Sequence, residues 1–372
     1  MKKIIVGVLL SLALMGAVRA DLAITSFQGN GQVTWINNLN TNAYFRVEWA
    51  SSPTGTWQRS FQSLSLIEAK SNTSFEASVP MFYRVVMTTN PPPSGMCFVE
   101  RGWFQIGYPD YNPTGTNWNI NISAFYMDRY LVTKTMWDQV RAWGLTNGYN
   151  DLSAGQAGSS GNSSSSNHPV TMVSWYDCVK WVNARSEKEG LTPCYYTNGT
   201  FAAVYRSGTN DIQSAWVRWD VNGYRLPTEC EWEKAARGGL VSRTFPWGDT
   251  IDGSMANFVN SGDIYDNGTT PVGYYNGSQL PAGKDMANGY GLYDMAGNLW
   301  ELCWDWRTNN PPIAGSVDPR GPDSGTVASR VARGGPWLNG RESQFARTAC
   351  RGGFYVYQQV NGCGFRCVRS KE

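Results

Sequence analysis

The residues best suited to chemistry are eight cysteines and a single histidine, His168. One histidine excludes a multi-histidine metal centre. A cysteine–histidine nucleophilic pair stays open as an interpretation, although the His-Pro-Val context of His168 is typical of a structural position. An even number of cysteines is typical of disulfides in a chain that passes through an oxidising compartment, but spacing alone does not give their pairing.

Two glutamates form a second candidate set. Glu229 and Glu233 are four residues apart, which places them on one exposed-looking face of a predicted helix. This spacing suits acid–base chemistry. Such a pair is more often a solvated face or one paired with arginine, and Arg237 follows four residues later. Both interpretations stay open.

Three short helices are predicted to position these residues. They begin at Thr133, running through Trp137 to about Trp143, at Ser174, running through Cys178 towards Gly190, and at Thr228, which precedes 229–237. Glu231 completes a capping box with Thr228, and Gly238-Gly239 ends that helix. The chain has 40 glycines, 17 tryptophans and only 16% charged residues. We therefore expect the region outside these helices to consist of strands and long loops, held in place by buried aromatic side chains, in an α+β domain.

Composition changes along the chain predict its organisation. Residues 1–20 have a basic start, an apolar stretch and small residues at the end, which predicts a signal peptide; a membrane anchor is the alternative. Residues 21–87 alternate β-branched and aromatic runs with turns, which predicts a small all-β, sandwich-like domain. A Pro-rich linker follows at 88–95. The large domain spans 96–370, with a loosely held Ser/Gly-rich excursion at 153–167.

Charge and hydropathy limit the partners. The 31 basic and 29 acidic residues give a net charge of +2 without blocks of one sign, so neither a nucleic acid nor an anionic membrane is indicated. No run after the signal peptide is long and apolar enough to cross a membrane. We therefore expect an exported protein, periplasmic or extracellular, with no membrane span after signal cleavage.

Several motifs occur in a fixed order in the large domain. They are 122–128 (ISAFYMD), 168–177 (HPVTMVSWYD), 225–239 (RLPTECEWEKAARGG), 245–248 (FPWG), 288–301 (NGYGLYDMAGNLWE), 330–337 (RVARGGPW) and 364–366 (GFR). In this order they resemble the formylglycine-generating, sulfatase-modifying factor family, over about 96–369. The resemblance implies a loop-rich variant of the C-type lectin-like fold.

The resemblance also shows a departure. In catalytic members a pair of cysteines follows the tryptophan that matches Trp337, where two thiolates bind copper and activate oxygen. Here the family's positions fall at about Asn339 and Gln344, with Arg341 between them in the groove. Neither amide can replace a thiolate, so copper is not expected and no catalytic residue is assigned. Cys350 lies too far along for simple alignment, although a local shift stays open.

Calcium and disulfides are further implications of the resemblance. Calcium sites would use the oxygen ligands that this ion prefers, at Asn257, Phe258 and either Asp263 or Asp266, and at Ala296, Gly297, Leu299 and Glu301. The alternative for Glu301 is a carboxylate that only accepts hydrogen bonds. The implied disulfide joins Cys178 to Cys367, with Cys303 to Cys350 as a weaker pairing. A metal clip at Cys363 and Cys367 is less favoured, and no pairing is assigned to Cys97, Cys194, Cys230 and Cys363.

Two classes of function follow. The first is a non-catalytic, calcium-stabilised recognition module whose aromatic and amide side chains bind a glycan or a peptide or protein. The alternative is an oxidoreductase that uses copper and oxygen to convert a sulfatase cysteine to formylglycine, or a divergent enzyme that uses the same groove.

Overall fold

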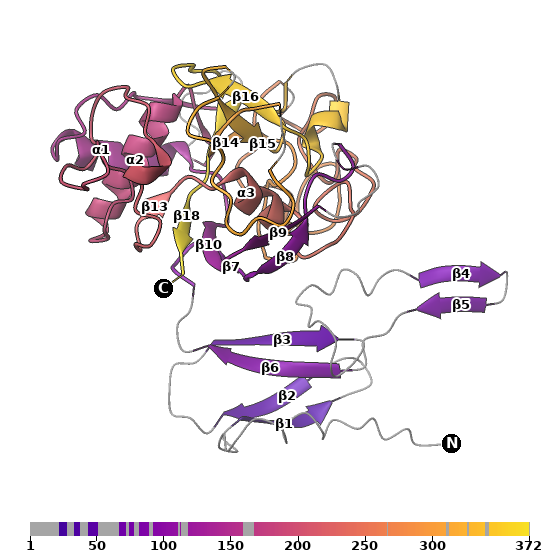
Figure 1. Ribbon diagram of the computed structural model, residues 1–372. Coiled ribbons are helices and arrows are strands. Elements are labelled where there is room, and N and C mark those ends of the chain that lie inside the picture. The colour runs from indigo at the N-terminus through magenta and orange to yellow at the C-terminus, as the bar shows by residue number, and fades with distance from the viewer. Residues whose placement is uncertain are drawn as a thin grey trace. The chain divides into compact units, whose positions relative to one another are not determined.

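The structure, a computed structural model, consists of two compact units, residues 1–91 and 92–372. It describes residues 22–27, 33–37, 44–50, 67–71, 74–77, 82–88, 92–110, 112, 118–158, 167–265, 267–309, 312–325, 327–338 and 342–371. The predicted signal peptide at 1–20 lies outside the described residues. The two units are described separately below (Figure 1).

Antiparallel strand pairs make up the described part of the first unit. β1 (Leu22–Phe27) pairs with β2 (Val33–Asn37), β3 (Tyr44–Ala50) with β6 (Phe82–Thr88), and β4 (Ile67–Ser71) with β5 (Ser74–Ala77). Strands rich in Val, Tyr, Phe and Trp form where the alternating pattern predicts them. Whether the pairs pack as a sandwich stays a prediction.

Two four-stranded sheets organise the second unit (Figure 1). The first has the order β13 (Tyr224–Arg225), β18 (Val368–Ser370), β10 (Phe125–Asp128), β7 (Met96–Val99). The second has the order β16 (Gly352–Tyr355), β15 (Ser329–Arg333), β14 (Trp300–Trp306), β17 (Cys363–Gly364). Two further pairs are β8 (Gly102–Gln105) with β9 (Asn119–Ile122), and β11 (Gln156–Ala157) with β12 (Val170–Thr171). The ends of the domain meet in the first sheet, because both β7 and β18 pair with β10.

The α-helices of the described residues start at the predicted caps. They are α1 (Lys134–Leu145), α2 (Trp175–Lys188) and α3 (Glu229–Ala236). Thr228 and Glu231 form the predicted capping box, and Ser174 forms one with Asp177 that the sequence analysis missed. Short 3-10 turns occupy Ser214–Trp216 and Glu342–Ala346. The expected mixture of helices and strands is therefore confirmed.

Buried aromatic side chains fill the space between the helices and the sheets. α1 packs against α2, where the rings of Trp137 and Trp181 stack at 5.5 Å, and Phe365 meets both rings edge-on. α3 packs against β14 and β15 (Figure 1). Every residue of β14 is buried, as befits a central strand covered on both faces.

One fully buried arginine depends on the aromatic core. The Arg330 guanidinium carbon lies 3.8 Å from the ring centre of Trp175 and 3.7 Å from that of Trp306. Burial lowers the pKa of Arg330 to about 9. Cation–π contact with the two rings and a hydrogen bond to the Trp304 carbonyl oxygen offset part of that desolvation.

The predicted loose excursion at 153–167 is wrong at its start. Gln156–Ala157 form β11, which pairs with β12, and residues 159–166 lie outside the described part of the chain. The hydrogen bonds of that short ladder override the Ser/Gly-rich composition. None of the helices in the described residues has the length and apolar character needed to cross a bilayer.

Candidate functional site

The predicted groove follows β15. Asn339 and Arg341 lie outside the described residues, whereas Gln344 lies exposed in the 3-10 turn Glu342–Ala346. The half-buried Trp337 donates its backbone N–H to the Asn298 carbonyl oxygen at 3.0 Å. Arg347 donates from Nε to the Gln344 carbonyl oxygen and pairs with Asp110 at 2.9 Å. The exposed edge of this segment is therefore held by Arg347.

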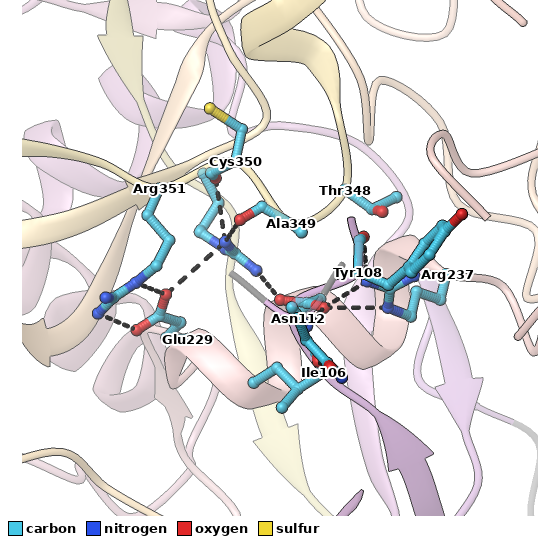
Figure 2. A network of polar contacts seen from close by, with 12 residues as sticks. Ile106, Tyr108, Asn112, Glu229, Arg237, Thr348, Ala349, Cys350 and Arg351 are labelled. Atoms are coloured by element: carbon cyan, nitrogen blue, oxygen red, sulfur yellow. Dashed lines mark hydrogen bonds and ion pairs between the residues drawn. The ribbon is translucent and has the colours of Figure 1, made fainter. Parts of the chain in front are cut away.

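A buried charge network contacts the end of the groove segment, residues 337–350, at Ala349 and Cys350 (Figure 2). Glu233 is 0% exposed and accepts hydrogen bonds from Arg237 at 2.6 Å, from the Gly107 backbone N–H at 2.7 Å, and from Arg333. Burial alone raises the pKa of the Glu233 carboxyl, but Arg237 and Arg333 outweigh it and hold the pKa below its usual range. Glu233 is therefore an ionised structural anchor.

Glu229 belongs to the same network. Its carboxylate accepts from Arg351 Nε at 2.5 Å and Nη2 at 2.9 Å, a bidentate arrangement (Figure 2). Arg333 Nη1 lies 3.7 Å from Glu229 and donates to the carbonyl oxygens of Ala349 and Cys350 at 2.8 and 3.0 Å. The arginines thus join α3 to the groove segment.

This geometry decides between the two interpretations of the glutamate pair. The expected exposed face is wrong, because Glu229 is only 1% exposed. Pairing with arginine is correct, both within the helix at Arg237 and from β15 and the segment that follows it. With every carboxylate oxygen engaged by a guanidinium, neither group is placed to move a proton.

Asp305 is the least compensated acid near this network. It is 3% exposed, and its Oδ2 accepts the Glu229 backbone N–H at 2.6 Å. Burial, followed by the nearby negative charge of Glu229, raises the pKa of Asp305 to about 7. A carboxyl that titrates near neutrality therefore lies at the start of α3.

Cys350 is the thiol nearest in sequence to the family's cysteine positions, and it is a free, half-buried cysteine. Burial, then the charge of Asp110, raises its pKa to about 11. The charged groups that act on it are Asp110, Arg333 and Arg347, and Cys350 is not bonded to another cysteine. A neutral thiol is a poor nucleophile and a poor copper ligand.

Three of the other cysteines, Cys178, Cys363 and Cys367, lie near one another. All eight lie among the described residues, and none is bonded to another. Cys178 is buried with Cys363 and Cys367 close enough to raise the pKa of its thiol, after burial itself and Asp177. The Cys178–Cys367 disulfide stays a prediction, although its two cysteines lie near one another. The predicted Cys303–Cys350 disulfide also stays a prediction, and its two cysteines pack in different clusters.

His168 occupies a buried position. Its Nδ1 lies 2.8 Å from the Thr269 hydroxyl, and Tyr265 meets its ring edge-on at 5.4 Å. Burial lowers the pKa of the His168 imidazole. These contacts agree with a structural histidine, and none of them is to a thiol.

The predicted calcium carboxylates already have protein partners. Glu301 is 0% exposed and accepts two hydrogen bonds from Arg366 at 2.7 Å and one from Trp232 at 2.8 Å. Asp263 accepts from Ser261, Tyr275 and the Tyr265 backbone N–H. Every oxygen of these two carboxylates thus accepts at least one hydrogen bond from the protein, and calcium would have to compete with Arg366 for Glu301.

The remaining predicted calcium residues lie in loops that touch. Asp266 is outside the described residues. The Asn257 carbonyl oxygen accepts the Asn298 backbone N–H at 2.8 Å, which brings the loop of Asn257 and Phe258 against the loop of Ala296, Gly297 and Leu299. Two buried oxygens in this region, Asn298 Oδ1 and Thr270 Oγ1, lack a partner among the described residues. Across this part of the chain, no group of three or more His, Cys, Asp or Glu side chains is arranged to hold a metal. Calcium therefore stays a prediction.

The architecture defines a class of loop-rich mixed α/β domain that solved structures share. Treponema denticola variable protein 1 is similar, with 27% sequence identity and a TM-score of 0.56 over 74% of this chain and 95% of that one. CarF is similar at 26% identity and a TM-score of 0.54, over 75% of this chain and 99% of that one.

The sulfatase-modifying factor enzyme 1-like domain family matches residues 83–371, so the chain belongs to this family, as its motifs predict. Formylglycine-generating enzyme of Bos taurus is 30% identical, over 74% of this chain and 75% of that protein. Chaperone protein LppX of Paenibacillus barcinonensis is also 30% identical, over 74% of this chain and 89% of that protein.

Glu301→Gln tests the buried ion pair. The substitution leaves the fully buried Arg366 without its directly paired carboxylate, so we expect the free energy of unfolding in denaturant to fall by about 3–5 kcal/mol. Asp138→Asn is the control, since it breaks the exposed pair with Lys134 and is expected to cost under about 1 kcal/mol. Equal small losses would contradict the assignment. If Glu301 ligates calcium instead, a chelator will lower the Tm of the wild type but not of the variant.

Asp305→Asn tests the buried carboxyl. The pKa is about 7 in the folded state and about 4 when unfolded. Between these values the folded state binds the extra proton, so this group makes stability fall as pH rises from about 4 to about 7. We expect the variant to lose less stability than the wild type between pH 5 and pH 8, by about 2.5 kcal/mol, because about two of the roughly three units of pKa difference fall inside this window. The measurement is denaturant unfolding at both pH values.

Asp323→Asn is the matched control for that experiment. Asp323 also accepts a backbone N–H, from Ser214 at 2.9 Å, but it is exposed. It should keep the wild-type dependence on pH. An unchanged pH dependence in Asp305→Asn would show that Asp305 is ionised throughout.

Proposed function

We propose that this chain is a non-catalytic recognition protein whose ligand binds at the groove segment between Trp337 and Cys350. The family's fold is held here by the buried Glu229–Glu233 network with its arginines, none of which requires a metal. The framework of the groove is therefore compatible with loss of the thiol pair.

One observation carries this proposal. Cys350 is a free thiol whose pKa is about 11, and Gln344 lies exposed at one of the two positions where the resemblance implies a cysteine. Copper-dependent oxygen activation in the catalytic members uses two neighbouring thiolates. The polar, exposed edge formed by Gln344 and Arg347 instead suits hydrogen bonding to a ligand.

The names of the relatives support a peptide or protein ligand. One relative with 30% identity is named a chaperone protein, and another is named for generating formylglycine. A groove that accepts a peptide segment serves either role. A glycan is the second candidate ligand, because aromatic and amide side chains also suit saccharides.

Three finer features belong to the same proposal. We infer the C-type lectin-like variant of the fold from the family resemblance. We infer export from the basic and apolar start of the sequence. Calcium stabilisation is retained as a proposal that now depends on loop oxygens such as Asn298 Oδ1 rather than on Glu301 alone.

The enzymatic alternative is tested with copper(I) and a Cys-x-Pro-x-Arg peptide. We expect the wild type neither to bind one copper ion tightly nor to convert the peptide cysteine to an aldehyde, measured by copper titration and mass spectrometry. The double variant Asn339→Cys with Gln344→Cys should gain copper binding, because only the soft ligands are missing. Cys350→Ser should leave the wild-type result unchanged. Aldehyde formation by the wild type would overturn the proposal.

The binding role is tested on a peptide array, followed by fluorescence anisotropy with the best peptide. We expect Arg347→Ala to weaken binding at least fivefold, because Arg347 holds the groove segment to Asp110. Arg243→Ala removes a comparable exposed pair, with Asp249, and is expected to change binding less than twofold. Equal effects of both variants, or no peptide bound, would contradict a peptide-binding groove. A glycan array then tests the second ligand class.

A further inference from the structure

A cavity lies away from the groove segment. It has a volume of about 240 Å³ and opens where the end of β9, the start of β10 and the end of β18 meet the loops of Trp219 and Arg320. It shares no lining residue with 337–351. Its volume is below the range of about 300–1,000 Å³ typical of sites for drug-sized ligands, so it suits a smaller molecule.

Of the three acids in the wall, Asp318 and Glu231 accept close hydrogen bonds from the protein, whereas Asp220 is exposed and pairs with Arg218 at 3.6 Å. Both oxygens of Asp318 accept from Ser123, one from the backbone N–H and one from the hydroxyl, each at 2.7 Å. Both oxygens of Glu231 accept from Arg225, at 2.6 and 2.7 Å. Each oxygen of these two carboxylates therefore already accepts at least one hydrogen bond.

The basic residues in the wall, by contrast, retain unused donors. No carboxylate of the described residues lies within ion-pair distance of Arg320, which Asp318, Glu231 and Asp220 influence only at longer range. Lys371 likewise contacts the Phe98 ring at 4.7 Å rather than an acid. Arg225 is 4% exposed, and its Nε has no partner in the described part of the domain. The basic side chains of the wall thus keep N–H donors for a ligand.

Arg320 is held in a fixed orientation. Its guanidinium carbon lies 4.4 Å from the ring centre of Trp219. That ring is itself fixed by a hydrogen bond from its N–H to the Ser214 carbonyl oxygen at 3.1 Å and by the edge-on ring of Trp304 at 5.4 Å. Stacking leaves the in-plane N–H groups of a guanidinium free for bidentate contact with an oxyanion. Burial and the nearby charge of Arg225 lower the pKa of Arg320, and a bound anion would stabilise the charged guanidinium against both effects.

We propose that this cavity binds a small organic anion of about hexose size, whose oxyanion group contacts the guanidinium of Arg320 with the help of the Lys371 ammonium. The shared chemistry is a carboxylate, phosphate or sulfate group on a compact polar body. The site is independent of the groove, so its test does not depend on the peptide-binding proposal.

The experiment titrates the full chain, by isothermal calorimetry, with glucuronate, glucose 6-phosphate and glucose 6-sulfate, each compared with glucose. These probes share a body and differ in the anionic group, so they distinguish carboxylate, phosphate and sulfate. We expect at least one of them to bind at least tenfold more tightly than glucose, and to weaken as salt is raised. No preference of any of the three over glucose would overturn the proposal.

Variants assign the binding to the cavity. Arg320→Ala is expected to weaken the preferred anion at least tenfold, and Lys371→Gln to weaken it two- to fivefold. Arg206→Ala is the matched control, because Arg206 also lies over an aromatic ring, Tyr149, but is paired with Glu187. It should change affinity less than twofold. Wild-type affinity in Arg320→Ala would place the anion elsewhere and refute the site; equal Tm values confirm that the variants are folded.

Discussion

The second unit depends on the exclusion of water from two glutamates and the arginines that neutralise them. Glu233 has no exposed surface, and it persists as an anion because Arg237 and Arg333 surround it. Glu229 is compensated in the same way by Arg351. Burying a charge without a partner costs several kcal/mol, so α3, β15 and the segment after Thr348 must assemble together or not at all.

In this arrangement the residues that support the backbone of the groove segment differ from the side chains that would contact a substrate or ligand. Arg333 holds the backbone of Ala349 and Cys350 through their carbonyl oxygens, and backbone contacts of this kind do not depend on which side chains the preceding segment carries. A family member can therefore exchange thiols for amides at the rim and keep the same support. Fold and reactivity vary independently in such a domain.

Local signals predicted local structure well. The starts of α1, α2 and α3 follow from Thr133, Ser174 and Thr228, because a cap needs only its own next three residues. The family could be identified from the sequence because each motif is a short contiguous segment and the motifs occur in the family's order. The β11 strand was missed, because a two-residue ladder leaves almost no trace in composition.

The site was harder to predict, because its partners are distant in sequence. The spacing of Glu229 and Glu233 could not reveal that Arg333, 100 residues beyond Glu233, covers both. The partner of Glu301 is Arg366, 65 residues away, and the resemblance suggested a metal there instead. Pairing across the fold, rather than any local pattern, determines whether a carboxylate is a ligand, an acid or an anchor.

The thiols of Cys178, Cys363 and Cys367 are neighbours, so in an oxidising compartment Cys178 could form a disulfide with either of the other two. Cys178 can bond to only one of the other two, and the two alternative rings differ by just the four residues from Cys363 to Cys367. Ring-closure entropy varies with the logarithm of length, so it barely distinguishes them. The native bridge would then be selected by local backbone geometry, and its formation would leave one sulfhydryl enclosed in the core.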